Sequence, residues 1–225
     1  MRIFERELYV KPFNPDGDVI VFGKSPEQEA ADLKDGIARF GGEGRHPSYL
    51  MAYVHAARTL INNGVSNHSL DDIGLPAFYL QRHALELLIK RLLSWAVEYA
   101  EAIHSNKIPC EQVSKDLNGS HKLGRLFTHL VCICQHLDFS LPPESIGLLI
   151  DKIQSYELSE TWARYDKSKN NTQHVETEIS LPIVSLQCEL EAVIHQILIG
   201  FNGSDSYEAE LYNAWADANI NVINT

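Results

Sequence analysis

The segment Leu75–Leu93, LPAFYLQRHALELLIKRLL, constrains the fold more than any other part of this 225-residue chain. Its proline suits the first turn of a helix, and apolar residues then recur on nearly every side of that helix. Three charged residues nevertheless stand in its middle at intervals of four: Arg82, Glu86 and Lys90. This polar row lies on one helix face, either as a solvated stripe of ion pairs or as a buried group that faces a pocket or a partner. The apolar surroundings favour a central helix with a buried row.

Helix signals recur along most of the chain. We predict helices from Ser25-Pro26 to Gly41-Gly42, from Pro47 to Asn62, from Pro76 to about His104, from about His121, after Pro142-Pro143, and in LPIVSLQCELEAVIHQILI and SDSYEAELYNAWADAN. The polar stretch before His121 is predicted to be a loop. Residues 160–180 show no sustained period and are predicted to form a long loop, an element that is often functional.

The N-terminal segment differs from the rest. Two β-prone stretches flank NPDG within Glu7–Phe22, and such Pro-Asp-Gly sequences favour turns because Pro fixes φ and Gly accepts positive φ. We predict a small β-hairpin or arm in residues 1–24 and a single domain in residues 25–225. The expected fold class is all-α, an up-and-down helical bundle with this N-terminal appendage.

Composition excludes several classes of function. A formal net charge of −11 argues against a protein that coats DNA with a general basic surface, because non-specific affinity comes from phosphate neutralisation. No apolar run approaches the roughly 18 to 20 residues that cross a bilayer, and the first six residues lack the regions of a secretion signal. The four cysteines show no pairing pattern of a secreted scaffold. We therefore expect a cytoplasmic protein that does not bind membranes.

Three sequence elements together resemble a known family. FYLQRHALELLIKRLL is followed by SHKLGRLF and then by the Arg-Tyr element of TWARYDK. Their order and spacing resemble the helical HEPN superfamily, in particular its bacterial branches with an Arg-His-x-x-Glu-x-x-x-Lys helix, a Gly/Ser-His-x-Leu helix start and an Arg-Tyr loop. The resemblance covers about two fifths of the chain, residues 76–166. It implies a helical bundle, a homodimer, and metal-independent RNA cleavage in a toxin–antitoxin or phage-defence system with RNA or an antitoxin as partner.

The chain departs from the pattern of the active family members. Those ribonucleases carry an Arg followed, after four to six residues, by a His on one helix. The literal match here runs from Arg39 to His46 across the glycine-rich FGGEGR, which is not a helical sequence. Arg125 and His129 share a helix face but stand one residue too close together.

A different set of residues offers the required chemistry. We predict that Arg82, His83, His121, Arg164 and Tyr165 converge as catalytic residues, with Glu86 and Lys90 in the same network. One imidazole would serve as general base and another as general acid, while guanidinium groups would hold a phosphate. The structural alternatives are that His121 caps a helix beside Ser120, that His83 is a surface residue, and that Arg164 binds Glu86.

No metal or cofactor is predicted. His129, Cys132 and His136 fall at i, i+3 and i+7 on one expected helix face, but no paired spacing elsewhere supplies a fourth ligand. Two functions therefore remain open: an RNA-cleaving enzyme, and a non-catalytic homodimeric interaction or sensing module. The excess apolar surface of Leu75 to Ala100 is the reason for expecting a homodimer.

Overall fold

The computed structural model describes residues 25–39, 48–103, 108, 110–158, 162–163, 167, 170, 173, 175, 177–200 and 206–223. Over these residues the chain forms helices and no strand, apart from an isolated bridge between Lys167 and Gln173. The helices are α1 (Pro26–Asp35), α2 (Tyr49–Ser66), α3 (Leu70–Ala102), α4 (Cys110–Gly119), α5 (Leu123–His136), α6 (Glu144–Tyr156), α7 (Ile183–Leu198) and α8 (Tyr207–Ile223). The helical prediction is confirmed for this part of the chain. The predicted hairpin lies outside the described residues.

The chain divides into two compact units, residues 1–52 and 53–225. The first unit contains α1, whose start at Ser25 and Pro26 agrees with the prediction, since Ser25 Oγ accepts the backbone N–H of Gln28 at 3.2 Å. Its predicted end is wrong, because Gly36 adopts a left-handed φ of 66° and ends the helix there. Arg39 follows the helix and is held by Asp32.

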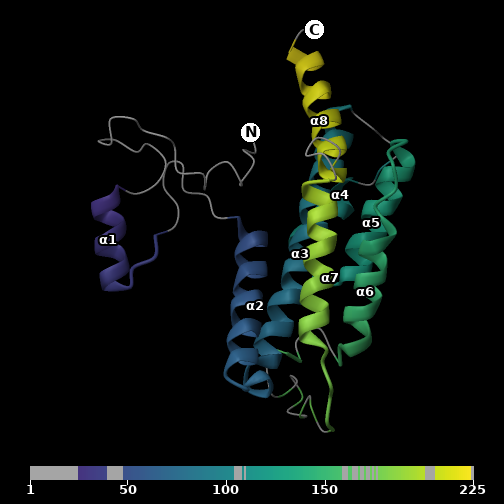
Figure 1. Cartoon of the computed structure of the whole chain (residues 1–225). Coiled ribbons are helices and arrows are strands. Elements are labelled where there is room, and N and C mark those ends of the chain that lie inside the picture. The colour runs from purple at the N-terminus through teal and green to yellow at the C-terminus, as the bar shows by residue number, and fades with distance from the viewer. Residues whose placement is uncertain are drawn as a thin grey trace. The chain divides into compact units, whose positions relative to one another are not determined.

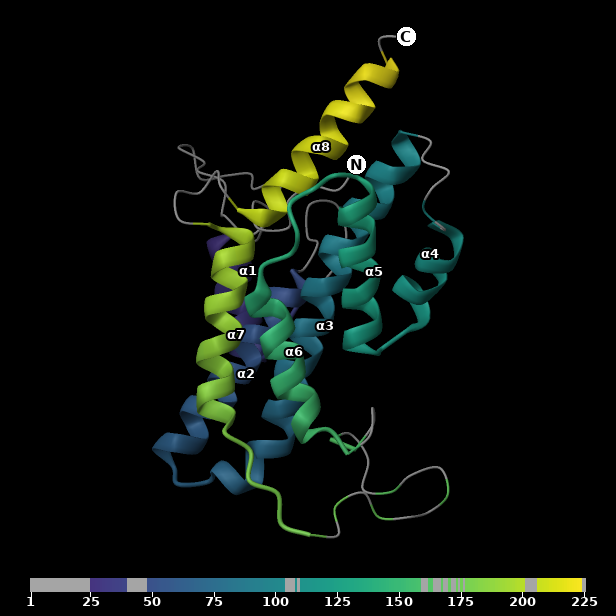
Figure 2. The ribbon, with the colours of Figure 1, turned by 90° about the vertical axis from the view of Figure 1, so that its right-hand side faces the viewer.

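The second unit is built around α3, a helix of 33 residues. It contacts α4, α5, α7 and α8, while α6 contacts α5 and α7 (Figure 1). Figure 2 shows α5, α6 and α7 alongside α3, and the C-terminal part of α8 extending past them. Side chains on almost every side of α3 are buried between Ala77 and Ala100, which confirms its central position.

Two helix boundaries differ from the prediction for identifiable reasons. Helix α3 starts at Leu70 and not at Pro76, and the acidic first turn, Asp71 and Asp72, favours this earlier start. Helix α2 continues past the expected stop at Asn62 to Ser66. Gly64 lies in a close approach of the two helices, where an added Cβ would meet Ile73 Cγ1 at 2.8 Å.

The connection between α3 and α5 also differs from the prediction. Its polar sequence was expected to be a loop, but Cys110–Gly119 form helix α4, which packs on α3 and α5. Packing of a few apolar side chains, such as the buried Val113, gives this short helix its stability. None of the helices in the described part has both the length and the apolarity that crossing a membrane requires.

Candidate functional site

The polar row of α3 is buried. Glu86 is 1% exposed and Arg82 is 6% exposed, so the solvated-stripe interpretation is wrong for these two residues. Lys90 lies nearer the surface, with 18% of its side chain exposed. A charged group in such a position requires partners, because the desolvation of an unpaired ion costs several kcal/mol.

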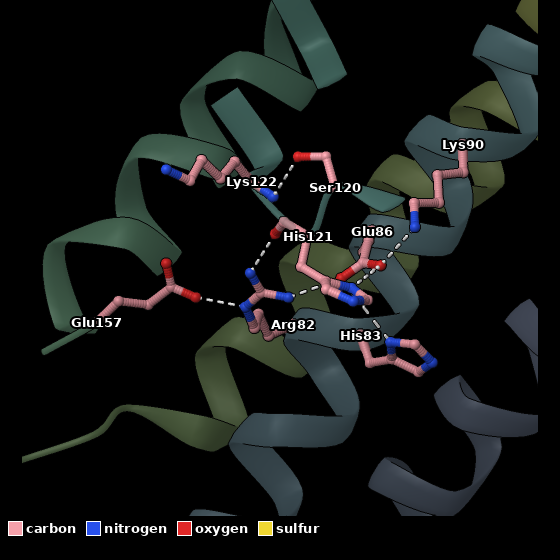
Figure 3. A network of polar contacts seen from close by, with 8 residues as sticks. All are labelled: Arg82, His83, Glu86, Lys90, Ser120, His121, Lys122 and Glu157. Carbon is pink, nitrogen blue, oxygen red and sulfur yellow. Dashed lines mark hydrogen bonds and ion pairs between the residues drawn. The ribbon is translucent and has the colours of Figure 1, made fainter. Parts of the chain in front are cut away.

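Glu86 is the centre of the site (Figure 3). Its Oε2 accepts a hydrogen bond from Arg82 Nη1 at 2.8 Å, and its Oε1 lies 3.0 Å from Lys90 Nζ. His121 Nδ1 lies 2.9 Å from the same Oε1, and His83 Nδ1 lies 4.0 Å from Oε2. One carboxylate therefore gathers two cations and two imidazoles.

Arg82 uses all three of its guanidinium nitrogens. Besides Glu86, it donates from Nη2 to the backbone carbonyl of His121 and from Nε to Glu157 Oε1. Three segments therefore meet at this arginine: the middle of α3, the residues before α5, and the residue that follows α6 (Figure 3). We did not predict Glu157 as a site residue, because no sequence spacing relates it to α3. The only indication in the sequence was its position as a charged residue between a helix and a long polar loop.

The charge state of Glu86 follows from its neighbours. Burial alone would raise the pKa of this carboxyl, but hydrogen bonds from Lys90 and His121, together with their charges, outweigh it and hold the pKa below its usual value. Glu86 is therefore ionised at neutral pH and can only accept hydrogen bonds. It follows that Nδ1 of His121 carries the hydrogen. In the neutral form of the ring, Nε2 is the acceptor nitrogen, and 52% of the His121 side chain is exposed.

His83 has a different environment. Its ring lies between Tyr53 of α2, in an edge contact at 4.5 Å between centroids, and Tyr79 of α3, nearly parallel at 5.8 Å. Burial lowers the pKa of His83, and although Glu86 opposes this shift, the positive charges of Arg82 and Lys90, and that of His121 when its ring is protonated, add to it. His83 is consequently a neutral, half-buried ring at pH 7, not the surface residue of the structural alternative.

The remaining candidates fall into two groups. Arg164 and Tyr165 lie outside the described residues, so their convergence on the site stays a prediction. Arg125 and His129 both bind Asp116 of α4, with Nε and Nε2 at 2.8 and 2.7 Å from Oδ2. They join α4 to α5 and do not reach Glu86.

The α5 residues that were considered as metal ligands make other contacts. His129 is occupied by Asp116, and His136 Nδ1 contacts the Cys132 carbonyl oxygen at 2.7 Å. Over the described residues, no group of three or more His, Cys, Asp or Glu side chains has a metal-binding arrangement.

Comparisons with known proteins add no assignment. No protein-family model matches the chain, and no match is found among curated proteins or solved structures.

Proposed function

We propose that this chain is a HEPN-like helical protein that cleaves RNA without a metal ion, at the site centred on Glu86. The observation that carries the proposal is the Glu86–His121 pair. A buried, ionised carboxylate accepts the Nδ1 hydrogen of a half-exposed imidazole at 2.9 Å. Such a carboxylate orients the ring and compensates the charge that the ring gains when it takes up a proton.

The chemistry assigned to the pair is cleavage at a ribose 2′-hydroxyl. Nε2 of His121 removes the hydroxyl proton, O2′ attacks the phosphorus atom, and the bond from phosphorus to O5′ breaks. The departing oxygen takes a proton from water, and the hydroxide that remains takes the proton held at Nε2, which restores the imidazole. The products are a 2′,3′-cyclic phosphate and a new 5′-hydroxyl. The lowered pKa of His83 argues against that residue as the acid, so its role is to line the site.

Positive groups near His121 suit an anionic substrate. Lys122 is exposed directly before α5, and the N-terminus of that 14-residue helix carries a partial positive charge. Lys90 adds a partly exposed ammonium group at Oε1 of Glu86, the oxygen that His121 also contacts. The formal net charge of −11 confines RNA contact to such a local area. The biological setting proposed with this activity is a toxin–antitoxin or phage-defence system.

A second candidate is the non-catalytic interaction or sensing module. The observation that favours it is the engagement of Arg82, each of whose three nitrogens already donates to an acceptor of the protein. In that case the network only fixes α3 against the residues before α5 and after α6.

An RNA cleavage assay separates the two candidates. A single-stranded RNA of mixed sequence is incubated with the protein in the presence of EDTA, and the ends of the fragments are identified. We expect cleavage with 2′,3′-cyclic phosphate ends, and a loss of about 10²-fold or more in rate for His121→Gln, the usual scale for a general base. Glu86→Gln should lower the rate as well, since it leaves a neutral partner for the imidazole.

The control is His55→Gln, which alters an exposed imidazole of α2. It should leave the cleavage rate unchanged, and thermal melts of all variants show whether each is folded. A folded parent protein that cleaves no RNA would leave the interaction module as the function. Cleavage that survives in folded His121→Gln would place the active site elsewhere.

A further inference from the structure

We propose that Glu157 is an autoinhibitory carboxylate, which occupies the Nε edge of Arg82 until a phosphate group of the substrate takes its place. The inference rests on the proposed function of the same site, because it concerns the binding of an anion there. It also accounts for how an arginine whose three nitrogens all bond to the protein can offer a phosphate its Nε edge.

The three acceptors of Arg82 are not equally fixed. Glu86 stands one turn further along the same helix, and the carbonyl of His121 belongs to the backbone directly before α5. Glu157 follows the last residue of α6, in an extended conformation with φ −77° and ψ 118°. Its side chain is 12% exposed, compared with 2% for that of Glu86. Of the three contacts, the one to Glu157 can therefore open with the least rearrangement of helices.

A phosphate is the natural competitor for this contact. Carboxylates and phosphates bind the same edges of a guanidinium group through charge-assisted hydrogen bonds. The exchange also preserves the balance of charge: two cations, Arg82 and Lys90, face two carboxylates, Glu86 and Glu157. Once Glu157 leaves, the site holds one positive charge in excess, which matches a single phosphodiester.

The test measures binding apart from cleavage. The probe is a fluorescent single-stranded oligodeoxynucleotide, which carries phosphodiesters but no 2′-hydroxyl, and its binding is followed by fluorescence anisotropy. We expect Glu157→Gln to bind about tenfold more tightly than the parent, equivalent to about 1.4 kcal/mol. The change keeps the side-chain shape and removes the competing charge.

A matched control separates this effect from a general change in net charge. Glu189 of α7 is also ion-paired, with Lys152 of α6, and within the described part of the chain its carboxylate bonds to Lys152 and Ser185, not to Arg82. Glu189→Gln alters the net charge by the same amount and should leave the affinity close to that of the parent. The gain in Glu157→Gln should disappear when Arg82→Gln is added.

Several outcomes would overturn the inference. They are equal affinities for parent and Glu157→Gln, an equal gain in Glu189→Gln, or a gain that persists without Arg82.

If Glu157→Gln does not fold, the Arg82 Nε–H signal of the parent is followed by NMR during a titration with inorganic phosphate. A saturating shift supports displacement of Glu157, and an unchanged signal overturns it. Tighter binding without RNA cleavage by any variant would refute the proposed function alone, and cleavage without tighter binding would refute this inference alone.

Discussion

At the scale of single residues, the site contains two ionisable groups whose environments shift their pKa values for different reasons. Glu86 stays ionised in the interior because Lys90 and His121 outweigh the cost of its burial. His83 stays neutral because burial and neighbouring cations outweigh the attraction of Glu86. Both pKa values are therefore lower in the folded chain than in the unfolded chain, and both groups stabilise the fold less as the pH falls.

The shift of His83 predicts a pH dependence of stability. The unfolded chain takes up this proton as the pH falls through about 6.5, whereas the folded chain takes it up only at lower pH. The contribution of His83 is thus fully present above about pH 6.5 and is lost as the pH falls through its folded pKa. We expect the free energy of unfolding to decrease between about pH 7 and about pH 5, and to decrease less in His83→Gln. Denaturant titrations at each pH measure this difference.

His55→Gln is the control for this prediction, because it removes an exposed imidazole from α2. It should keep the pH dependence of the parent. Glu86 does not interfere, since its contribution is lost only below the ordinary glutamate pKa of about 4.5. A His83→Gln variant with the full pH dependence of the parent would show that His83 is not the group responsible.

The sequence predicted the residues of the site unevenly. The i, i+4 spacing together with the apolar surroundings predicted the burial of Arg82 and Glu86, and the structure confirms it. The meeting of this row with His121, 35 residues away from Glu86, is also confirmed. Glu157 could not be predicted in the same way. Its contact with Arg82 depends on how α6 packs in three dimensions, and no local periodicity encodes that.

At the scale of elements, local signals failed where packing between helices decides the boundary. NNG has the composition of a helix end, yet α2 continues through it because Gly64 allows Ile73 of α3 to approach. Helix α4 has a polar sequence and gains its stability from packing on α3 and α5, which no short segment reveals. Gly36 ends α1 because a glycine readily adopts the left-handed conformation at a helix C-terminus. Our sequence prediction placed the helix end at Gly41-Gly42 and overlooked Gly36.

Two glycines provide a matched test of the close approach between α2 and α3 at Gly64. Gly74 lies within α3 with nothing within 4 Å of an added Cβ, so Gly74→Ala should stabilise the fold by about 0.5 to 1 kcal/mol through helix propensity. Gly64→Ala has the same propensity gain, but its Cβ would meet Ile73 Cγ1 at 2.8 Å. Overpacking of this kind costs about 1 to 3 kcal/mol, so we expect a net loss of stability. Urea titrations compare the two variants, and equal stabilisation by both would contradict the close approach.

At the scale of the whole molecule, α3 contributes more buried apolar side chains than any other helix of the described part. The apolar surface that led us to expect a homodimer is covered by α4, α5, α7 and α8 of the same chain. Homodimer formation therefore stays a prediction without support from α3.

Helix α8 contributes to the cover over α3. Its buried Glu208 accepts hydrogen bonds from Arg91 and from Trp95 Nε1, at 3.0 Å for the latter. The core of the second unit thus depends on the last helix of the described chain.

The division into two units leads to a prediction about truncation. Residues 53–225 contain the central helix, its covering helices and the Glu86 site, so this unit has a core of its own. A chain that begins at Ser48 keeps the start of α2, where Ser48 Oγ and the Ser48 carbonyl accept the N–H groups of Met51 and Ala52. We expect its melting temperature to lie within about 2 to 4 °C of the parent, the change that about 1 kcal/mol produces in a domain of this size. Circular dichroism should also show that any strand signal of the predicted N-terminal arm is lost. A truncated chain that no longer unfolds cooperatively would show that the helical core depends on residues 1–47.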